Sequence, residues 1–169
     1  MKKLAICFFT VSMTILLFNA CRSKADLSGE QESIKAVIKG EINASCEGDY
    51  DKWTTFFVHE PYVLFLQANK NYYLDLKGWD TLSVAAKNWI RPSRKGTILF
   101  GGNSNYVFRI SGNIAWVSFT TTSTLTSDCG ESKLVGIEVR TLEKHEGSWK
   151  IAYLGSVYSS TYEGKNTDN

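Results

Sequence analysis

The chain has 169 residues, with 19 Lys and Arg against 17 Asp and Glu, and it begins with two lysines before an apolar run from Leu4 to Phe18. That run is shorter than the roughly 20 apolar residues of a spanning helix, and it predicts the hydrophobic region of a secretory signal. Without residues 1–20, which carry two lysines and no acid, 17 basic side chains face 17 acidic ones. This balance disfavours a nucleic-acid partner, because such proteins grip phosphates with surplus Lys and Arg.

The stretch Leu17-Phe18-Asn19-Ala20-Cys21 resembles the lipobox of bacterial lipoproteins, where a small residue precedes the cysteine that becomes the lipidated N-terminus. Acyl chains contribute about 0.8 kcal/mol per buried methylene, so a multiply acylated Cys21 would hold a domain on a membrane. We therefore expect a signal peptide over residues 1–20 and a lipidated polar linker over 21–29. The protein would lie in the bacterial cell envelope, with the outer membrane favoured over the inner. The alternative is an ordinary secretory signal and an unrelated cysteine.

Two cysteines remain once Cys7 has left with the signal and Cys21 is lipidated. Cys46 is expected at a helix end and Cys129 in a turn-rich stretch. The compartment outside the cytosol permits a disulfide between them, but two cysteines far apart in sequence do not establish one. Two free, partly buried thiols are the default expectation.

Helix signals come first along the remaining chain. Ser28, with Gln31 three residues later, forms a capping-box pattern, and apolar residues at helical spacing predict a helix from there to about Cys46. Asp49 can cap a second, short helix that ends before Pro61.

Strand patterns then dominate. Residues 62–66 read as a buried strand with which 72–76 can pair, and a third helix is expected over 80–90. From Gly96 onward the pattern is strand after strand, with Gly101-Gly102 among the predicted turns. This order of elements predicts an α+β fold in which the helices cover one face of an antiparallel sheet.

Two of the predicted turns, Gly112-Asn113 and Glu146-Gly147, fix a register if each is a two-residue hairpin loop. One face of the first hairpin is then wholly apolar, and a pair of opposite charges supports the second register. The predicted opposite pairs are Ile110 with Ala115, Phe108 with Val117, Tyr106 with Phe119, Glu143 with Lys150, Leu142 with Ile151, Arg140 with Tyr153 and Glu138 with Gly155.

Two stretches carry a likeness to a known superfamily: residues 34–57, with Gly48-Asp49-Tyr50-Asp51 between two helices, and residues 140–151, with a Gly-x-Trp-Lys-Ile hairpin. Together with the order of elements, they resemble the nuclear transport factor 2-like superfamily, in particular its SnoaL-like and ketosteroid-isomerase-like branches. The resemblance implies three N-terminal helices packed in the concave face of a strongly curved, mostly antiparallel sheet, a cone-shaped, cystatin-like roll. It also implies an apolar pocket at the open end and frequent dimerisation through the sheet. We expect this single domain over residues 30–162, followed by a polar tail over 163–169.

The resemblance speaks against one enzymatic route. The isomerase relatives carry a carboxylate base on the strand after the second helix, where this chain has Leu64, Phe65 or Leu66. An enzyme using that route would therefore lack its base.

Glu138 and Arg140 are the candidate polar site, because alternate residues of a strand share one face and the predicted register places Tyr153 beside them. Arg140 could clamp an anionic group that Glu138 orients or deprotonates, while Gly136 and Gly155 leave space for a ligand. The alternative is a structural ion pair on the sheet.

Aromatic side chains supply the candidate pocket walls, although aromatic residues at such spacings are more often core. No metal site or cofactor is expected, since the histidines His59 and His145 do not lie at metal-ligand spacing with other ligands. The candidate wall residues are Trp53, Phe57, Trp89, Tyr106 and Phe119.

Three functions remain open. The first is a membrane-anchored domain that binds a small, largely apolar molecule, without catalysis. The second is an isomerase, cyclase or dehydratase with Glu138 as base and Arg140 and Tyr153 as partners. The third is a structural envelope protein that forms a homodimer or docks a partner through the outer sheet face bearing Trp116.

Overall fold

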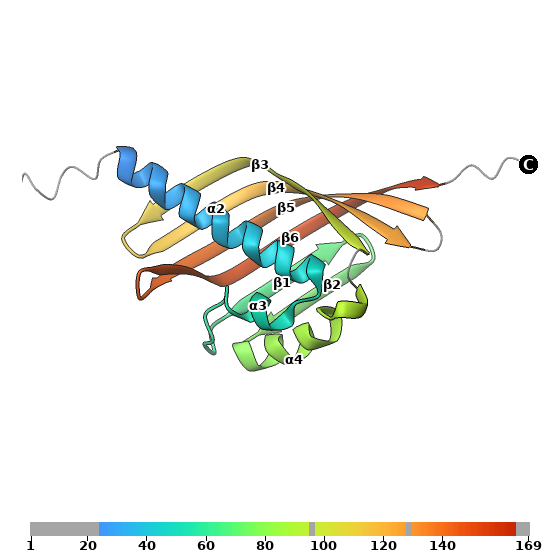
Figure 1. Ribbon diagram of the computed structural model, residues 1–169, viewed down its shortest axis with the longest axis horizontal. Helices are drawn as coiled ribbons and strands as arrows, with labels where there is room; N and C mark the ends of the chain where they lie inside the picture. Colours follow the sequence, from blue (N-terminus) through green and yellow to red (C-terminus); the bar gives the residue numbers. More distant parts are fainter. Residues whose placement is uncertain (1–23, 95–96, 128–129, 165–169) are drawn as a thin grey trace, which may run out of the picture. The chain divides into compact units, whose positions relative to one another are not determined.

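A six-stranded sheet in the order β2-β1-β6-β5-β4-β3 organises the fold (Figure 1). The computed structural model describes residues 24–94, 97–127 and 130–164. The helices are α2 (Lys24–Glu47), α3 (Tyr50–Thr54) and α4 (Trp79–Trp89), followed by the 3-10 turn η1 (Pro92–Arg94). The strands are β1 (Leu64–Asn69), β2 (Tyr72–Lys77), β3 (Ile98–Ser111), β4 (Ile114–Ser127), β5 (Gly130–His145) and β6 (Ser148–Gly164).

The first helix begins before the predicted cap. Ser28 lies inside α2, because residues 24–27 (Lys-Ala-Asp-Leu) include good helix formers that continue the helix towards the N-terminus. The capping-box prediction is therefore wrong, whereas the helix end near Cys46 is confirmed. The described chain divides into two units between Glu32 and Ser33, and the sheet, α3 and α4 all belong to the second.

Asp49 caps α3 as predicted, its side chain accepting a hydrogen bond from the Lys52 backbone N–H at 3.0 Å. The preceding Gly48 has φ +70°, and a Cβ there would lie 2.2 Å from the Arg91 carbonyl oxygen. Glycine at this break therefore provides both the left-handed backbone and the close approach of the segment after α4. Beyond α3, Phe57 forms a parallel bridge with Ile151 on β6.

The strand pair predicted after α3 is confirmed, with β1 and β2 antiparallel from Leu64–Lys77 to Asn69–Tyr72. β1 also runs parallel to β6, which joins the hairpin to the long strands. α4 begins after Gly78 and packs on the β1–β2 hairpin.

β3 to β6 are long antiparallel strands, and the sheet they form is curved and unclosed (Figure 1). Gly101-Gly102 is not a turn. It is a register shift within β3, between Phe100 and Gly102, because the chain continues along the same edge of β4 on both sides of it.

Four of the seven predicted strand pairs are confirmed. The other three fail beyond β-bulges: Tyr106 lies in a bulge of β3, and Ala152 is an extra residue in β6. Arg140 therefore pairs with Leu154 rather than Tyr153, and Glu138 with Ser156 rather than Gly155. The confirmed pairs are Ile110 with Ala115, Phe108 with Val117, Glu143 with Lys150 and Leu142 with Ile151.

The hydrophobic core lies between the helices and the inner face of this sheet. From Ser33 onward α2 crosses the long strands (Figure 1), and Ile34 and Ile38 on it are fully buried. The inner-face residues Val117 and Leu142 are fully buried as well, so the predicted placing of helices against one sheet face is confirmed.

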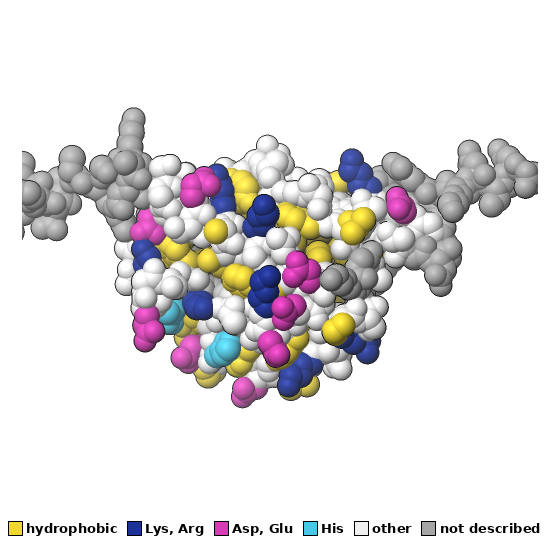
Figure 2. Space-filling model, viewed as in Figure 1, with side chains coloured by type: hydrophobic (Ala, Val, Ile, Leu, Met, Phe, Trp, Pro, Cys, Tyr) yellow, Lys and Arg dark blue, Asp and Glu magenta, His cyan; other side chains and the backbone are white. Residues whose placement is uncertain are grey.

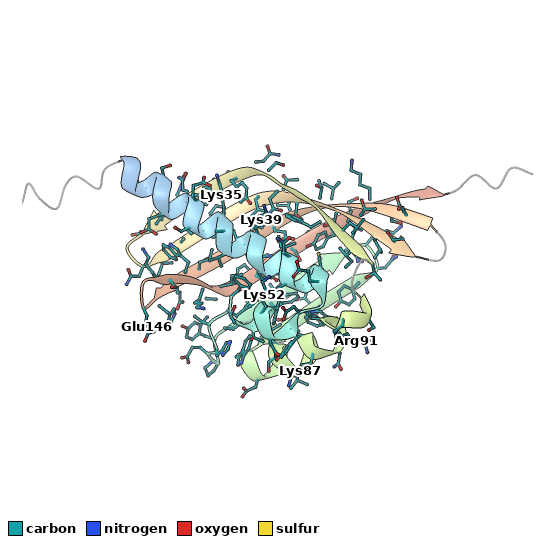
Figure 3. All side chains as sticks on the ribbon, in the orientation of Figure 1. Lys35, Lys39, Lys52, Lys87, Arg91 and Glu146 are labelled. Atoms are coloured by element: carbon teal, nitrogen blue, oxygen red, sulfur yellow. The ribbon has the colours of Figure 1, made fainter. Side chains whose placement is uncertain are left out.

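The face shown in Figure 2 carries basic and acidic side chains interspersed with exposed apolar ones. Figure 3 shows Lys35 and Lys39 on α2 and Lys87 on α4. The Lys35 ammonium lies 5.3 Å from the centre of the Tyr106 ring, and Lys87 lies over Tyr50 at the same distance. No helix among the described residues is both long and apolar enough to cross a membrane.

Candidate functional site

Glu138 and Arg140 share the inner face of β5, as the sequence predicted, and each is only 2% exposed. Glu138 Oε2 lies 2.6 Å from Arg140 Nη2. Period-two alternation brings the two side chains to one face, and burial among the helices makes their charges interact strongly. The pair is the centre of the candidate site.

A second carboxylate, Glu41, reaches the pair from α2. Its Oε2 lies 3.3 Å from Arg140 Nη2, and its Oε1 accepts a hydrogen bond from Trp53 Nε1 at 2.7 Å. Sequence reasoning missed Glu41. The signal was present, because Glu41 follows Ile34 and Ile38 at helical spacing and so lies on the buried face of its helix.

Tyr158, and not Tyr153, completes the cluster: its hydroxyl donates a hydrogen bond to Glu138 Oε1. The bulge at Ala152 reverses the alternation of β6, so Tyr153 pairs with Thr141 on the outer face. The register that placed Tyr153 beside Arg140 is therefore corrected.

The two glycines expected to leave space for a ligand instead accommodate tyrosine side chains. A Cβ on Gly136 would lie 2.6 Å from Tyr158 Cδ1, and a Cβ on Gly155 would lie 2.3 Å from the Tyr153 hydroxyl oxygen. Gly136 thus permits the approach of Tyr158 to the cluster. Gly155 leaves room for the Tyr153 side chain on the opposite face of the sheet.

The cluster places two carboxylates around one guanidinium with almost no contact with solvent. Burial raises the pKa of Glu41 despite the neighbouring Arg140, and the Glu138 charge raises it further. Burial alone would lower the pKa of Arg140, but Glu138 and Glu41 offset that effect and raise it. Burial and Glu138 raise the pKa of Tyr158 well above its usual range. Glu41 therefore keeps its proton to a higher pH than a free glutamate does, Arg140 stays charged at ion-pair distance from Glu138, and Tyr158 stays protonated.

Some polar atoms of the cluster remain unpartnered among the described residues. Arg140 Nε and Nη1 are buried and donate to no acceptor, and Glu138 Oε2 meets Arg140 at ion-pair distance without hydrogen-bond alignment. Buried polar groups are nearly always satisfied by protein, water or ligand. The buried guanidinium therefore keeps two nitrogen donors that no described residue satisfies.

The candidate wall residues fall into three groups. Trp53 and Phe57 have ring centres 4.3 Å apart beside the cluster, whereas Tyr106 and Phe119 lie 5.2 Å apart on the sheet. The guanidinium carbon of Arg140 lies 5.6 Å from the Phe119 ring centre. Trp89 lies elsewhere, 5.6 Å from Phe65. The structure thus brings four of the five aromatic candidates to the cluster. Phe119 lies against Arg140 with Tyr106 beside it, and Trp53 is hydrogen-bonded to Glu41 with Phe57 beside it.

The histidines lie apart from this cluster. The His59 ring stacks on Trp79 at 3.9 Å, and His145 Nε2 lies 3.2 Å from Glu143 Oε2. Among the described residues no group of three or more His, Cys, Asp and Glu side chains could hold a metal ion. Cys46 is a free thiol, while Cys21 and Cys129 lie outside the described residues.

No protein-family model and no curated protein matches the chain. Solved structures do match. A nuclear transport factor 2-like protein of unknown function from Shewanella oneidensis is 19% identical, with a TM-score of 0.58 over 76% of this chain and 98% of that one. A candidate scytalone dehydratase from Novosphingobium aromaticivorans is 17% identical, with a TM-score of 0.61 over 83% and 89%.

The association domain of CaMKII from C. elegans is 15% identical, with a TM-score of 0.62 over 78% of this chain and 96% of that one. Likeness at this level of identity establishes a shared architecture and leaves function to the site. The chain therefore has the nuclear transport factor 2-like fold, as its sequence predicted.

Proposed function

We propose that this chain is a lipid-anchored domain that binds a small, largely apolar molecule through the inner face of its sheet. The observation that carries the proposal is the buried guanidinium of Arg140, whose Nε and Nη1 have no acceptor among the described residues. Phe119 lies against the same guanidinium. Such surroundings favour an apolar ligand with one acceptor group that meets the free donors.

Native mass spectrometry of the detergent-purified chain tests this binding by recording any small molecule that copurifies. We expect a bound species in the wild type that is lost in Arg140→Met, with near-UV circular dichroism confirming that the variant is folded. The exposed Lys52→Ala variant is the control and should retain the species. Loss from both variants, or no bound species and no binding from lipid and aromatic libraries, contradicts the proposal.

The anchor is proposed from the sequence, since Cys21 lies outside the described residues. We expect wild-type chain in the membrane fraction and labelled by a palmitate analogue. Cys21→Ser should lose the label, whereas Cys46→Ser should keep it. Labelling that survives Cys21→Ser contradicts the lipoprotein proposal.

A dehydratase- or isomerase-type enzyme is the second candidate, favoured by the two carboxylates of the cluster. Burial raises the pKa of Glu41 while Glu138 pairs with Arg140, and carboxylates with different protonation states can serve as acid and base. A structural neighbour is a candidate scytalone dehydratase. Against Glu138 as base, Tyr158 and Arg140 engage its two oxygens. Conversion of the copurifying molecule by wild type but not by Glu138→Gln would establish catalysis.

We also propose that the outer sheet face pairs with a second copy of the chain. Ile137 and Val157 lie directly opposite one another there, 64% and 62% exposed, and Ala68 and Tyr73 continue the row across β1 and β2. The neighbours include an association domain and a hub. Sedimentation should show a dimer that Ile137→Asp dissociates and Val84→Asp, on the exposed side of α4, does not. A monomeric wild type contradicts this pairing.

A further inference from the structure

Asn103, a half-buried residue on the edge strand β3, lies outside the charged cluster. Both its Oδ1 and its Nδ2 are buried, and neither has a hydrogen-bond partner among the described residues. Asn103 pairs with Thr121 on β4, and the same row continues through Gly136 on β5 to Tyr158 on β6. The amide therefore shares the inner face of the sheet with the cluster, three strands away from Tyr158 along one row.

The first of two bulges turns Asn103 inward, and the second restores the original alternation beyond it. β3 pairs regularly with β4 from Ser111 down to Val107, shifts register before Ser104, and shifts again between Gly102 and Phe100. Each shift adds one residue to β3 and reverses which side chains face inward. Without the first shift Asn103 would point outward, and Gly102 and Ser104 inward.

The inverted segment is three residues long, and Asn103 is its centre. The first shift contains Asn105 with φ +54°, and the second ends at Gly102 with φ +135°. A left-handed backbone is uncommon for a non-glycine residue, and asparagine is one of the few residue types that adopt it readily. The backbone thus departs from a regular strand in two places, and the inverted segment between them carries an inward-facing side chain whose amide atoms are buried and have no hydrogen-bond partner among the described residues. Bulges are over-represented both at sheet edges, such as β3, and next to active sites, where they re-aim a side chain.

We propose that Asn103 contacts the ligand and selects one that carries a neutral amide-like group. This inference rests on the proposed binding function. An asparagine side chain presents an acceptor and donors in one plane, and its best complement is a group that also donates and accepts side by side, such as a carboxamide or lactam. A carboxylate offers no donor. It would also add negative charge near a cluster in which Glu41 and Glu138 already outnumber Arg140.

Three probes with the same aromatic body test the inference: 2-naphthamide, 2-naphthoate and 2-ethylnaphthalene. Their affinities are measured by fluorescence on the mature chain, residues 21–169 with Cys21→Ser, which contains every described residue. The wild-type sequence should bind 2-naphthamide tightest. Asn103→Leu should lower the affinity for 2-naphthamide about tenfold or more and leave the affinity for 2-ethylnaphthalene unchanged, because only the amide probe loses a hydrogen-bond partner. Ser104→Ala, the outward neighbour, is the matched control and should change neither affinity.

The outcomes separate the two proposals. If 2-naphthamide and 2-ethylnaphthalene bind equally well and Asn103→Leu changes neither, the inference about Asn103 is overturned and the binding function stands. If none of the three probes binds, the binding function fails and the inference fails with it. Should Asn103→Leu not fold, Asn103→Asp keeps the size and replaces the donor, and it must show the same selective loss of 2-naphthamide.

Discussion

Glu41 on α2 and Arg140 on β5 are 99 residues apart in sequence, yet Glu41 Oε2 lies 3.3 Å from Arg140 Nη2 in the interior. Arg140→Met removes the positive charge and keeps much of the volume, which leaves two carboxylates facing each other. Breaking a buried ion pair in this way costs about 3–5 kcal/mol, so urea unfolding should show a free energy lower by that amount. Lys52→Ala, which breaks the exposed Lys52–Glu47 pair, should cost less than about 1 kcal/mol.

A double variant gives the charge account its sharpest test. Adding Glu41→Gln to Arg140→Met leaves Glu138 as the one carboxylate of the cluster without a cationic partner, so part of the lost stability should return. If the double variant is less stable than Arg140→Met by the full cost of Glu41→Gln alone, the destabilisation came from lost packing around Arg140 and the charge account is wrong.

The pH dependence of stability follows from Glu41. Its pKa is raised in the folded state, so the folded chain holds this proton more tightly than the unfolded chain. The contribution to stability is present below the unfolded pKa of about 4.5 and is lost as the pH rises through the folded value. The slope is at most about 1.4 kcal/mol per pH unit for one proton.

Glu41→Gln should flatten this pH dependence. The free energies of unfolding of wild type and variant should lie closer together at low pH than at neutral pH. Urea unfolding across the pH range measures it, with Glu47→Gln on the exposed part of the same helix as control. Parallel curves for wild type and Glu41→Gln would show that Glu41 is ionised alike in both states.

Gly136 is expected to tolerate no side chain, because a Cβ there would lie 2.6 Å from Tyr158 Cδ1. Gly136→Ala must displace the ring and disturb its hydrogen bond to Glu138, at a cost of about 1–3 kcal/mol. In a Tyr158→Leu background the same substitution should cost clearly less, since the obstructing ring is absent. Equal costs in the two backgrounds contradict the assigned contact.

The strand pairs next to each turn can be predicted from the sequence, but the predicted register is wrong beyond a bulge. A two-residue loop fixes the register of Leu142 with Ile151. The residue types around Ala152 give no sign that β6 carries an extra residue there. Because of this one extra residue, Tyr158 and not Tyr153 lies beside Glu138. Side chains of the site that lie past a bulge are therefore beyond pattern reasoning, whereas Glu138 and Arg140, two apart on one strand, are within it.

Glu41 is a different kind of omission, because its helical spacing after Ile34 and Ile38 does place it on a buried face. A single carboxylate among apolar residues of an amphipathic helix is a signal for a buried partner, and the partner here comes from β5.

Cys46 should be an unreactive thiol. Burial, with Glu41 and Glu47 nearby, raises its pKa from 9.0 to about 11. The thiolate is the reactive form, and two pKa units lower its fraction at pH 8 by about 100-fold. Iodoacetamide labelling of a chain with Cys21→Ser and Cys129→Ser should therefore be slower by that order when folded than when unfolded in guanidinium. Glu47→Gln should raise the rate only slightly, because burial dominates the shift; a large rise would make the charge of Glu47 the main cause.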